Sequence, residues 1–362
     1  MTQDTRINYL RRQLVAASLG SLAARGAWAQ DNAARNRELY LYKGADREAR
    51  LIEGAKKEGL VQIFTSMNLK DSQTFADQFK KKFGVTAEVW RASSEMVQNR
   101  GSAEAGTNIF SCDVFETNAP EMELLSRKGV LGAFYSRYFS DLPPGAFPKH
   151  RNYVADRFNF FTLAYNTKLI KSEDVPNTLE DLLHPRFAGM IGIETGDSDW
   201  FAAVIKSMGE EKGQAYFKAL AATKPQMYSG HSFLAAVVAI GQASITPALY
   251  NHTVEKLLAQ RGTINWKPLQ PTFGRAGVIG PALNAPHPHG AMLFIDFMLS
   301  PAGQSILVKR NRVPSSTAVE TKLNKFPYEM IDPVISLDQG EKWDKLWSNL
   351  FLGGKIIKKE AE

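Results

Sequence analysis

Helix-like and strand-like patterns alternate from Asp46 onward, and this alternation limits the fold more than any other feature. The first stretch reads as helix, strand, helix and strand over residues 46–58, 60–64, 71–82 and 85–89. Phe75, Phe79 and Phe83 recur every four residues, which predicts one buried face on the second helix. Two strands joined through a helix normally lie parallel in one sheet. We therefore predict an α/β protein.

A second series of helices and strands follows a long extended stretch at 153–165, and another extended stretch lies at 272–281. This order predicts two lobes, each a central mixed sheet flanked by helices, joined by two hinge crossings. We assign 46–155 and about 276–362 to lobe 1 and 156–275 to lobe 2; alternatively, the C-terminal helices pack on lobe 2. A cleft between the lobes is where a small ligand is buried in such folds.

The amino-terminal residues read as an export signal rather than as part of the fold. Arg11 and Arg12 precede an apolar run at 14–24, and Ala27-Trp28-Ala29 has the small-x-small pattern of a cleavage site. Residues 1–29 are thus predicted as a signal peptide and 30–45 as a polar lead-in without clear period. The apolar run is too short to span a bilayer. We expect a soluble periplasmic protein, not embedded in the membrane, exported by the Sec or the twin-arginine route.

The charge of the chain argues against a nucleic-acid partner. The whole chain carries +7, and the leader holds four basic residues and one acidic residue, so the mature protein carries +4. No lysine and arginine tract with interleaved aromatic residues is present. The segment before the lobes also has neither the length nor the pattern of a helix-turn-helix, which excludes a DNA-binding regulator.

Several short motifs resemble those of one bacterial family, and they occur in that family's order. They are Glu58-Gly59-Leu60-Val61 running into Phe64-Thr65-Ser66, Cys112 to Phe115, Ala164 to Thr167, Leu182 to Gly189, and Phe297 to Pro301 followed by Gly303-Gln304. The chain is similar to extracellular solute-binding proteins of the ferric-iron-binding type, which serve ABC importers. This resemblance implies a type 2 periplasmic binding fold, no cofactor, and docking onto permease subunits. We expect a monomer.

The same resemblance raises the question of ferric iron. The iron binders of the family use a His, a Glu and a tandem Tyr-Tyr, and these positions fall on Asn68, Asn118 and Asn251-His252, with Tyr250 just before. Ferric iron prefers hard, charged ligands, and neutral amides do not balance its charge. Direct iron ligation is therefore not the favoured prediction, although ferric iron stays an alternative.

Small polar residues gather at the turns that lead into helices. A helix amino terminus offers unbonded N–H groups and a positive dipole end, so anions bind there; the same residues can also serve only as helix caps. Arg157 is a candidate partner for a carboxylate or phosphate. The predicted ligand-binding residues are Thr65, Ser66, Asn68, Ser94, Asn118, Arg157, Thr195, Gly196, Asp197, His231, Ser232 and Tyr250.

The charge of the ligand is left open by two acidic residues. Asp197 and Asp199 lie in the loop that would hold an anion, and they would repel it unless arginines or ligand hydroxyls bind them. They could instead face a polyamine-like cation, with Trp200 and Tyr250 as aromatic walls. We favour an organic acid or a phosphate ester over such a cation.

An enzyme is the main alternative class. Gly230-His231-Ser232 begins like the nucleophile elbow of a hydrolase, but the second glycine is absent. His287 and His289 resemble metal ligands, yet they are surrounded by prolines, and a helix amino terminus explains them better. We therefore predict a binding protein rather than an enzyme, with no metal cofactor.

Overall fold

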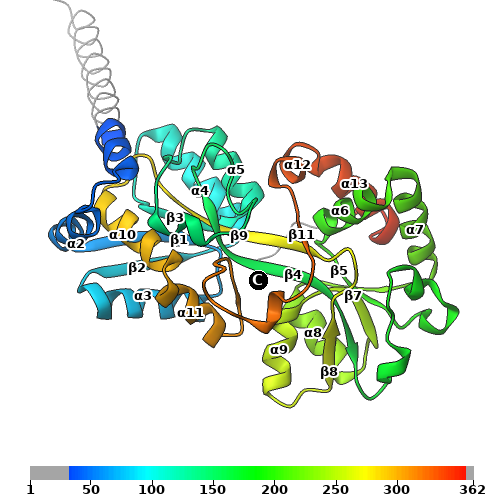
Figure 1. Ribbon diagram of the computed structural model, residues 1–362. Coiled ribbons are helices and arrows are strands. Elements are labelled where there is room, and N and C mark those ends of the chain that lie inside the picture. Colours follow the sequence, from blue (N-terminus) through cyan, green and yellow to red (C-terminus); the bar gives the residue numbers. More distant parts are fainter. Residues whose placement is uncertain (1–31, 356–362) are drawn as a thin grey trace, which may run out of the picture.

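The computed structural model describes residues 32–355 of the 362-residue chain. The predicted signal peptide at 1–29 lies outside the described residues. The described chain forms two lobes joined by two long strands (Figure 1).

The first lobe is built on three parallel strands, as the βαβ pattern predicts. Strand β1 pairs with β2 on one side and with β3 on the other; the bounds are β1 (Leu60–Thr65), β2 (Thr86–Arg91) and β3 (Val114–Asn118). The flanking helices are α2 (Arg47–Glu58), α3 (Leu69–Phe83), α4 (Ser94–Thr107), α5 (Ala119–Arg127), α10 (Pro288–Leu299) and α11 (Pro301–Lys309). Phe75, Phe79 and Phe83 are all buried, which confirms the predicted face of α3.

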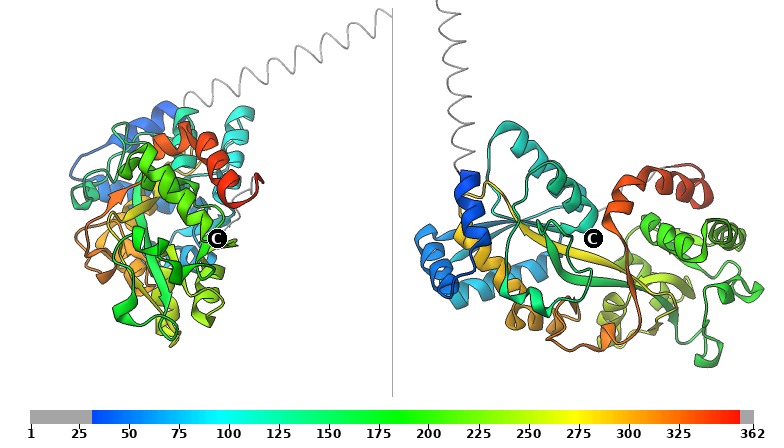
Figure 2. Two further views of the ribbon diagram at one scale, coloured as in Figure 1. Left: turned by 90° about the vertical axis from the view of Figure 1, so that its right-hand side faces the viewer. Right: turned by 45° about the horizontal axis from the view of Figure 1, so that its top comes forward.

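Two long antiparallel strands, β4 (Val154–Asn166) and β9 (Phe273–Pro281), run from the first lobe into the second and lie side by side (Figure 2). In the first lobe, β9 pairs with β3; in the second, β4 pairs with β7 (Ile245–Tyr250) and β8 (Ile264–Lys267). Every residue of β4 is buried. These strands are the two crossings predicted from the sequence, and they make one mixed sheet continuous through both lobes.

Short strands complete this nine-stranded sheet at its margins. They are β10 (Val313–Pro314), which pairs with β4, and β11 (Glu329–Met330), which pairs with β9. Five 3-10 helices lie in the connections, at Arg137–Asp141, Ser172–Asp174, Glu180–Leu183, Pro185–Phe187 and Lys322–Asn324.

The second lobe adds a separate two-stranded parallel sheet, β5 (Gly192–Glu194) with β6 (Gln226–Tyr228). Its helices are α6 (Ser198–Met208), α7 (Glu210–Ala222), α8 (His231–Ile240) and α9 (Asn251–Ala259). The buried apolar side chains form one cluster in the first lobe and two in the second. Strand β4 serves both lobes, because Phe160 packs in the first cluster and Phe161 in the second.

The carboxyl-terminal helices contact both lobes. Helix α12 (Pro333–Asp338) packs against α5, and Asp338 forms an ion pair with Arg127 of that helix. Helix α13 (Gly340–Phe351) packs on α6 and α7, and its Trp343 and Trp347 join the core of the second lobe. The residue limits of the two lobes stay a prediction.

The lead-in differs from the sequence expectation, because residues 32–41 are helical. Tyr40 is fully buried, and its hydroxyl donates to the carbonyl of Ala282 at 2.7 Å. Asn36 donates to the carbonyl of Leu283 at 3.0 Å. Polar side chains hold this helix against the first lobe. Its sequence therefore carries little of the apolar periodicity from which a helix is predicted.

Among the described helices, none is by itself long and apolar enough to cross a membrane. The bent pair α10 and α11 passes that test only when its two parts are taken together.

Candidate functional site

A cavity of about 700 Å³ lies between the lobes and beneath α12 and α13. Gln98 and Asn118 line it from the first lobe, Asp199 and Ala202 from the second, and Arg275 from β9. Of the twelve predicted site residues, Asn118 lines this cavity directly. Most of the others lie in the groups described next, whereas Asn68 and Ser232 do not join them.

Four predicted residues meet at the carboxyl ends of β1 and β3. Thr117 donates to the hydroxyl of Ser66 at 3.1 Å, and Asn118 donates to the hydroxyl of Ser94 at 2.9 Å. Thr65 lies in the same row, directly opposite Glu116. These residues lie together because the strand ends converge at one edge of the sheet.

Asn68 does not join this group. Its side chain is exposed, and it accepts a hydrogen bond from the Lys70 amide at 3.1 Å at the start of α3. Asn68 is therefore a helix cap in this structure, the simpler of the two readings of such residues.

Arg157 belongs to a buried group that we call the Arg157 cluster: Thr65, Glu116, Asp156 and Arg157. The guanidinium forms ion pairs with Glu116 and with Asp156, the latter at 3.2 Å. Glu116 also accepts hydrogen bonds from the Thr65 hydroxyl and the Met67 amide. Burial raises the pKa of Asp156 to about 7, although Arg157 pulls it down. The sequence analysis offers the Arg157 guanidinium to an anionic ligand. In the structure this guanidinium is already paired with two carboxylates of the protein.

A second arginine, Arg275 of β9, lies on the same face of the sheet as Arg157. Asn159 is paired with Arg275 and Arg157 with Gly277. Because paired residues and residues two apart on a strand share a face, Arg157 and Arg275 share one. We call Asp199, Tyr250 and Arg275 the Arg275 cluster. Arg275 donates to Asp199 through Nε at 2.7 Å and again through Nη2, and to the Tyr250 hydroxyl through Nη1. The Asp199 carboxylate therefore faces an arginine of its own chain.

The side chain of Glu194 organises the loop between β5 and α6. Glu194 accepts hydrogen bonds from the amides of Gly196 and Gly230. The Thr195 carbonyl accepts from the Trp347 indole at 2.7 Å. The Gly196 amide that the sequence assigned to an anion therefore has a carboxylate partner, which does not support that part of the prediction.

Asp197 and His231, both predicted site residues, are buried beside Glu194. His231 Nε2 lies 3.2 Å from Asp197 Oδ1, and the His231 ring packs on that of Tyr250 with centroids 3.9 Å apart. Ser232, the next residue of α8, has an exposed side chain and does not join this group. The start of a nucleophile elbow at 230–232 therefore does not place a buried serine beside the histidine.

A third polar group joins the two lobes. Asp71 at the start of α3 forms ion pairs with Arg310 and Arg312, the latter at 2.8 Å. Arg312 also contacts His252 at the start of α9. Burial holds the pKa of His252 well below its usual value, and the charge of Arg312 adds to this effect.

Some buried polar atoms near these groups have no hydrogen-bond partner among residues 32–355. They include Asn159 Oδ1 on β4, Asn251 Oδ1 and His252 Nδ1 at the start of α9, and both carboxylate oxygens of Asp197. Buried polar groups are normally hydrogen-bonded to protein, water or ligand. Asn159 on the crossing strand β4 and the start of α9 are therefore candidate contacts for a polar ligand.

The sequence did not single out Glu116, Asn159 or Arg275. Their significance depends on strand register, which aligns Asn159 with Arg275 and Glu116 with Thr65. The signal that could have found them is the presence of polar residues on strands whose other residues are apolar.

His287 and His289 flank the start of α10, as the helix-terminus interpretation predicts. Each has a carboxylate partner distant in sequence: His287 Nδ1 lies 2.9 Å from Asp113, and His289 Nδ1 lies 2.7 Å from Glu58. The two pairs are separate contacts that attach α10 to the first lobe.

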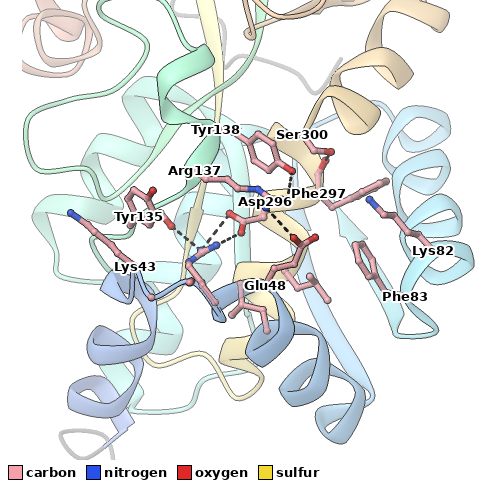
Figure 3. A pocket seen from close by; sticks show the side chains of 15 residues that line it. Lys43, Glu48, Lys82, Phe83, Tyr135, Arg137, Tyr138, Asp296, Phe297 and Ser300 are labelled. Atoms are coloured by element: carbon pink, nitrogen blue, oxygen red, sulfur yellow. Dashed lines mark hydrogen bonds and ion pairs between the residues drawn. The ribbon is translucent and has the colours of Figure 1, made fainter.

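A smaller cavity of about 250 Å³ lies in the first lobe between α2, α10 and the segment 135–138 (Figure 3). None of the predicted site residues lines it. Four of its charged groups form ion pairs with one another, Arg47 with Asp296 and Arg137 with Glu48. The cavity between the lobes therefore remains the better candidate.

Known proteins that are similar to this chain share its two-lobed fold. A family model described as bacterial extracellular solute-binding protein matches residues 111–339, more than half of the chain. A curated relative, the Fe(3+)-binding periplasmic protein of Serratia marcescens, is 24% identical over 196 residues. That match covers 51% of this chain and 55% of the relative, so the chain spans about half the length of the curated relative it matches.

The match to solved structures of the same architecture extends over nearly the whole length of those proteins. Iron-bound HitA from Pseudomonas aeruginosa superposes with a TM-score of 0.69 at 19% identity, covering 80% of this chain and 99% of HitA. AfuA from Actinobacillus pleuropneumoniae, with fructose-6-phosphate bound, gives 0.68 at 21% identity and covers 81% and 98%. These likenesses establish the type 2 periplasmic binding fold.

Proposed function

Because this chain belongs to the family of bacterial extracellular solute-binding proteins, we propose that it captures a small organic acid or phosphate ester between its lobes. In this proposal it delivers that solute to the permease subunits of an ABC importer, as a monomer exported to the periplasm. The lobes rotate about β4 and β9 as they close on the solute, and differential affinity for the closed form drives the closure.

The observation that carries the proposal is the unsatisfied polar group at the crossing strands. Asn159 Oδ1 is buried without a hydrogen-bond partner in the described chain and belongs to the residue aligned with Arg275. Arg275 lines the cavity between the lobes. In this proposal the solute contacts Arg275 in the cavity and extends along the crossing strands to Asn159, where it gains a hydrogen bond that the described chain leaves unmade.

The balance of charge favours a solute with both anionic and hydroxyl groups. Arg157, Arg275 and Arg312 are each paired with carboxylates, so the site does not present bare positive charge. A guanidinium has five N–H donors, however, and can bind a carboxylate or phosphate in addition to its partner. Solute hydroxyls can donate to side-chain oxygens such as Asn159 Oδ1. The sugar phosphate bound to AfuA has this combination of groups.

Ferric iron is less well supported as cargo. At the positions that the family resemblance assigns to iron ligands, Asn68 caps α3 and Asn118 donates to Ser94. Both are neutral amides, which do not offset the charge of a ferric ion.

A thermal-shift screen of residues 30–362 tests the proposal. The compounds are organic acids, phosphate esters, polyamines and ferric salts, followed by calorimetry of any compound that raises the Tm. A ligand at a hundred times its Kd stabilises the folded protein by about 2.7 kcal/mol. We expect one-to-one binding by an organic acid or phosphate ester, without turnover.

Arg275→Gln provides the matched test of location. We expect it to weaken solute binding at least tenfold, whereas Arg186→Gln, at an exposed ion pair of the second lobe, leaves binding unchanged. Equal affinity in both variants would place the solute elsewhere. Hydrolysis of a phosphate ester by the purified protein, or no stabilising compound in any class, would overturn the proposal.

A further inference from the structure

Three buried residues of the second lobe come together behind the Arg275 cluster: Glu194, Asp197 and His231, which we call the buried triad. Glu194 ends β5, Asp197 precedes α6, and His231 begins α8. One carboxylate oxygen from each acid and one ring nitrogen of the histidine lie within 4.8 Å of one another. Oxygen and imidazole nitrogen ligands from separate elements are the donor set of many metal sites.

The outer contacts of the buried triad hold two of these side chains in place. Glu194 is bound by the Gly230 amide at 2.9 Å and by the Gly196 amide. The His231 ring packs against the rings of Tyr250 and Phe161. Fixed outer contacts of this kind orient the ligands in metal sites and are part of their affinity.

Asp197 supplies an independent sign that a ligand is needed. Its side chain is fully buried, and within the described chain neither carboxylate oxygen takes part in a hydrogen bond. Its charged contacts are ion-pair distances from Oδ1, 3.2 Å to His231 Nε2 and 3.6 Å to Arg275 Nη2. A buried carboxylate without hydrogen bonds is costly unless a cation is bound to it.

The arginine that faces Asp197 is also bound by a second carboxylate. Glu194 and Asp197 are both buried. The nearest arginine, Arg275, is engaged by Asp199 through two of its nitrogens. Asp197 therefore shares this guanidinium with Asp199.

We propose that the buried triad binds one divalent transition-metal ion, for which Zn²⁺ is the best match. Zinc bonds to oxygen and nitrogen are about 2.0–2.2 Å, so tetrahedral ligand atoms lie about 3.3 Å apart. The Asp197 to His231 separation of 3.2 Å already has this value. The site uses none of Asn68, Asn118 or Asn251, the positions that the family resemblance assigns to iron. The ion would hold β5, α6 and α8 together next to Arg275.

The test uses the full mature chain stripped of metal by a chelator and dialysed. Zn²⁺, Mn²⁺ and Ca²⁺ are each titrated by calorimetry, bound metal is counted by elemental analysis, and Co²⁺ is added to read absorption bands of a bound ion. Asp197→Asn and His231→Gln remove one ligand each. His184→Gln is the control, because His184 is an exposed histidine of the same lobe. Circular dichroism in chelator reports whether each variant folds.

We expect the wild type and His184→Gln to bind one equivalent of Zn²⁺, and each ligand variant to lose at least tenfold in affinity. If only one ligand variant folds, it alone decides the test. No zinc bound by the wild type, or equal zinc binding by a folded ligand variant, would leave a simple ion pair of Asp197 with His231. Solute binding is measured separately on metal-free protein, so failure of the metal site does not count against solute capture.

Discussion

The Arg157 cluster and the buried triad are both buried polar groups beside the crossing strands, but they differ in how completely their charges are satisfied. Arg157 is bound by Glu116 and Asp156, and Glu116 in turn accepts from Thr65 and Met67. In the buried triad, Asp197 has no hydrogen bond within the described chain. The first group is closed on itself, whereas the second has unused capacity. Buried charge therefore acts as a structural brace in the Arg157 cluster and as a candidate binding group in the buried triad.

The largest effect should come from breaking the closed group. Glu116→Gln leaves the Arg157 charge with Asp156 alone, and breaking a buried ion pair typically costs about 3–5 kcal/mol. We expect a loss of about 3 kcal/mol in the free energy of unfolding, because Asp156 still offsets part of the charge. Urea denaturation measures it, with the exposed Glu211→Gln as control. A change as small as that of the control would contradict the role of Glu116 as a brace.

The pH dependence of stability should expose Asp156. Its pKa is about 7 in the folded protein and 3.8 when unperturbed, so the native carboxyl keeps a proton that the unfolded one loses. The stability from this proton is complete below pH about 4 and is lost as the pH rises to about 7. The slope approaches about 1.4 kcal/mol per pH unit. We expect urea titrations of wild type minus Asp156→Asn to have this slope; a flat difference from pH 4 to 8 would refute it.

A smaller and different effect is expected at Asn159, whose oxygen lacks a partner within residues 32–355. Asn159→Ala should raise the Kd for the captured solute about tenfold, equivalent to about 1.4 kcal/mol. The unfolding free energy should change less than this, because no hydrogen bond of that oxygen is lost within the protein. Calorimetry with the solute found by screening measures the Kd, and the exposed Asn265→Ala is the control. Unchanged affinity would remove Asn159 from the site.

The smallest effect on stability should come from the buried triad itself. Asp197→Asn, measured in chelator, should change the unfolding free energy by less than about 1 kcal/mol, because it also relieves the repulsion between two buried carboxylates. Denaturation in urea beside Glu116→Gln compares the two groups directly. A loss as large as that of Glu116→Gln would mean that the two groups are braces of the same kind.

The parts of the fold that depend on local pattern were predictable from sequence. The stripe of Phe75, Phe79 and Phe83 and the crossing strands at 153–165 and 272–281 all appear where the residues indicate. The helix at 32–41 was not predicted, because distant contacts such as that of Tyr40 with Ala282 anchor it.

Of the twelve predicted site residues, only Asn118 lines the cavity between the lobes, and their role in binding stays a prediction. The turns at Thr65, Ser94 and His231 do lie near the crossings, since strand ends converge. The partners of the charged groups were not predictable: Arg157 meets Glu116, and Arg275 meets Asp199, across long stretches of chain. Such pairs follow from the register between strands and from helix placement, and hydrophobic periodicity carries no information about either.

The pairing of β4 with β9 has a mechanical consequence. Seven register positions join the strands from Val154 to Phe161, so the crossings form a single hydrogen-bonded ribbon rather than two independent flexible joints. Rotation of one lobe against the other therefore has to twist this ribbon, and the paired strands resist that twist elastically. Arg157, Asn159 and Arg275 are carried on the ribbon, so every degree of twist turns their side chains relative to one another. In the proposed function, the residues that the twist reorients are therefore also those expected to contact the solute.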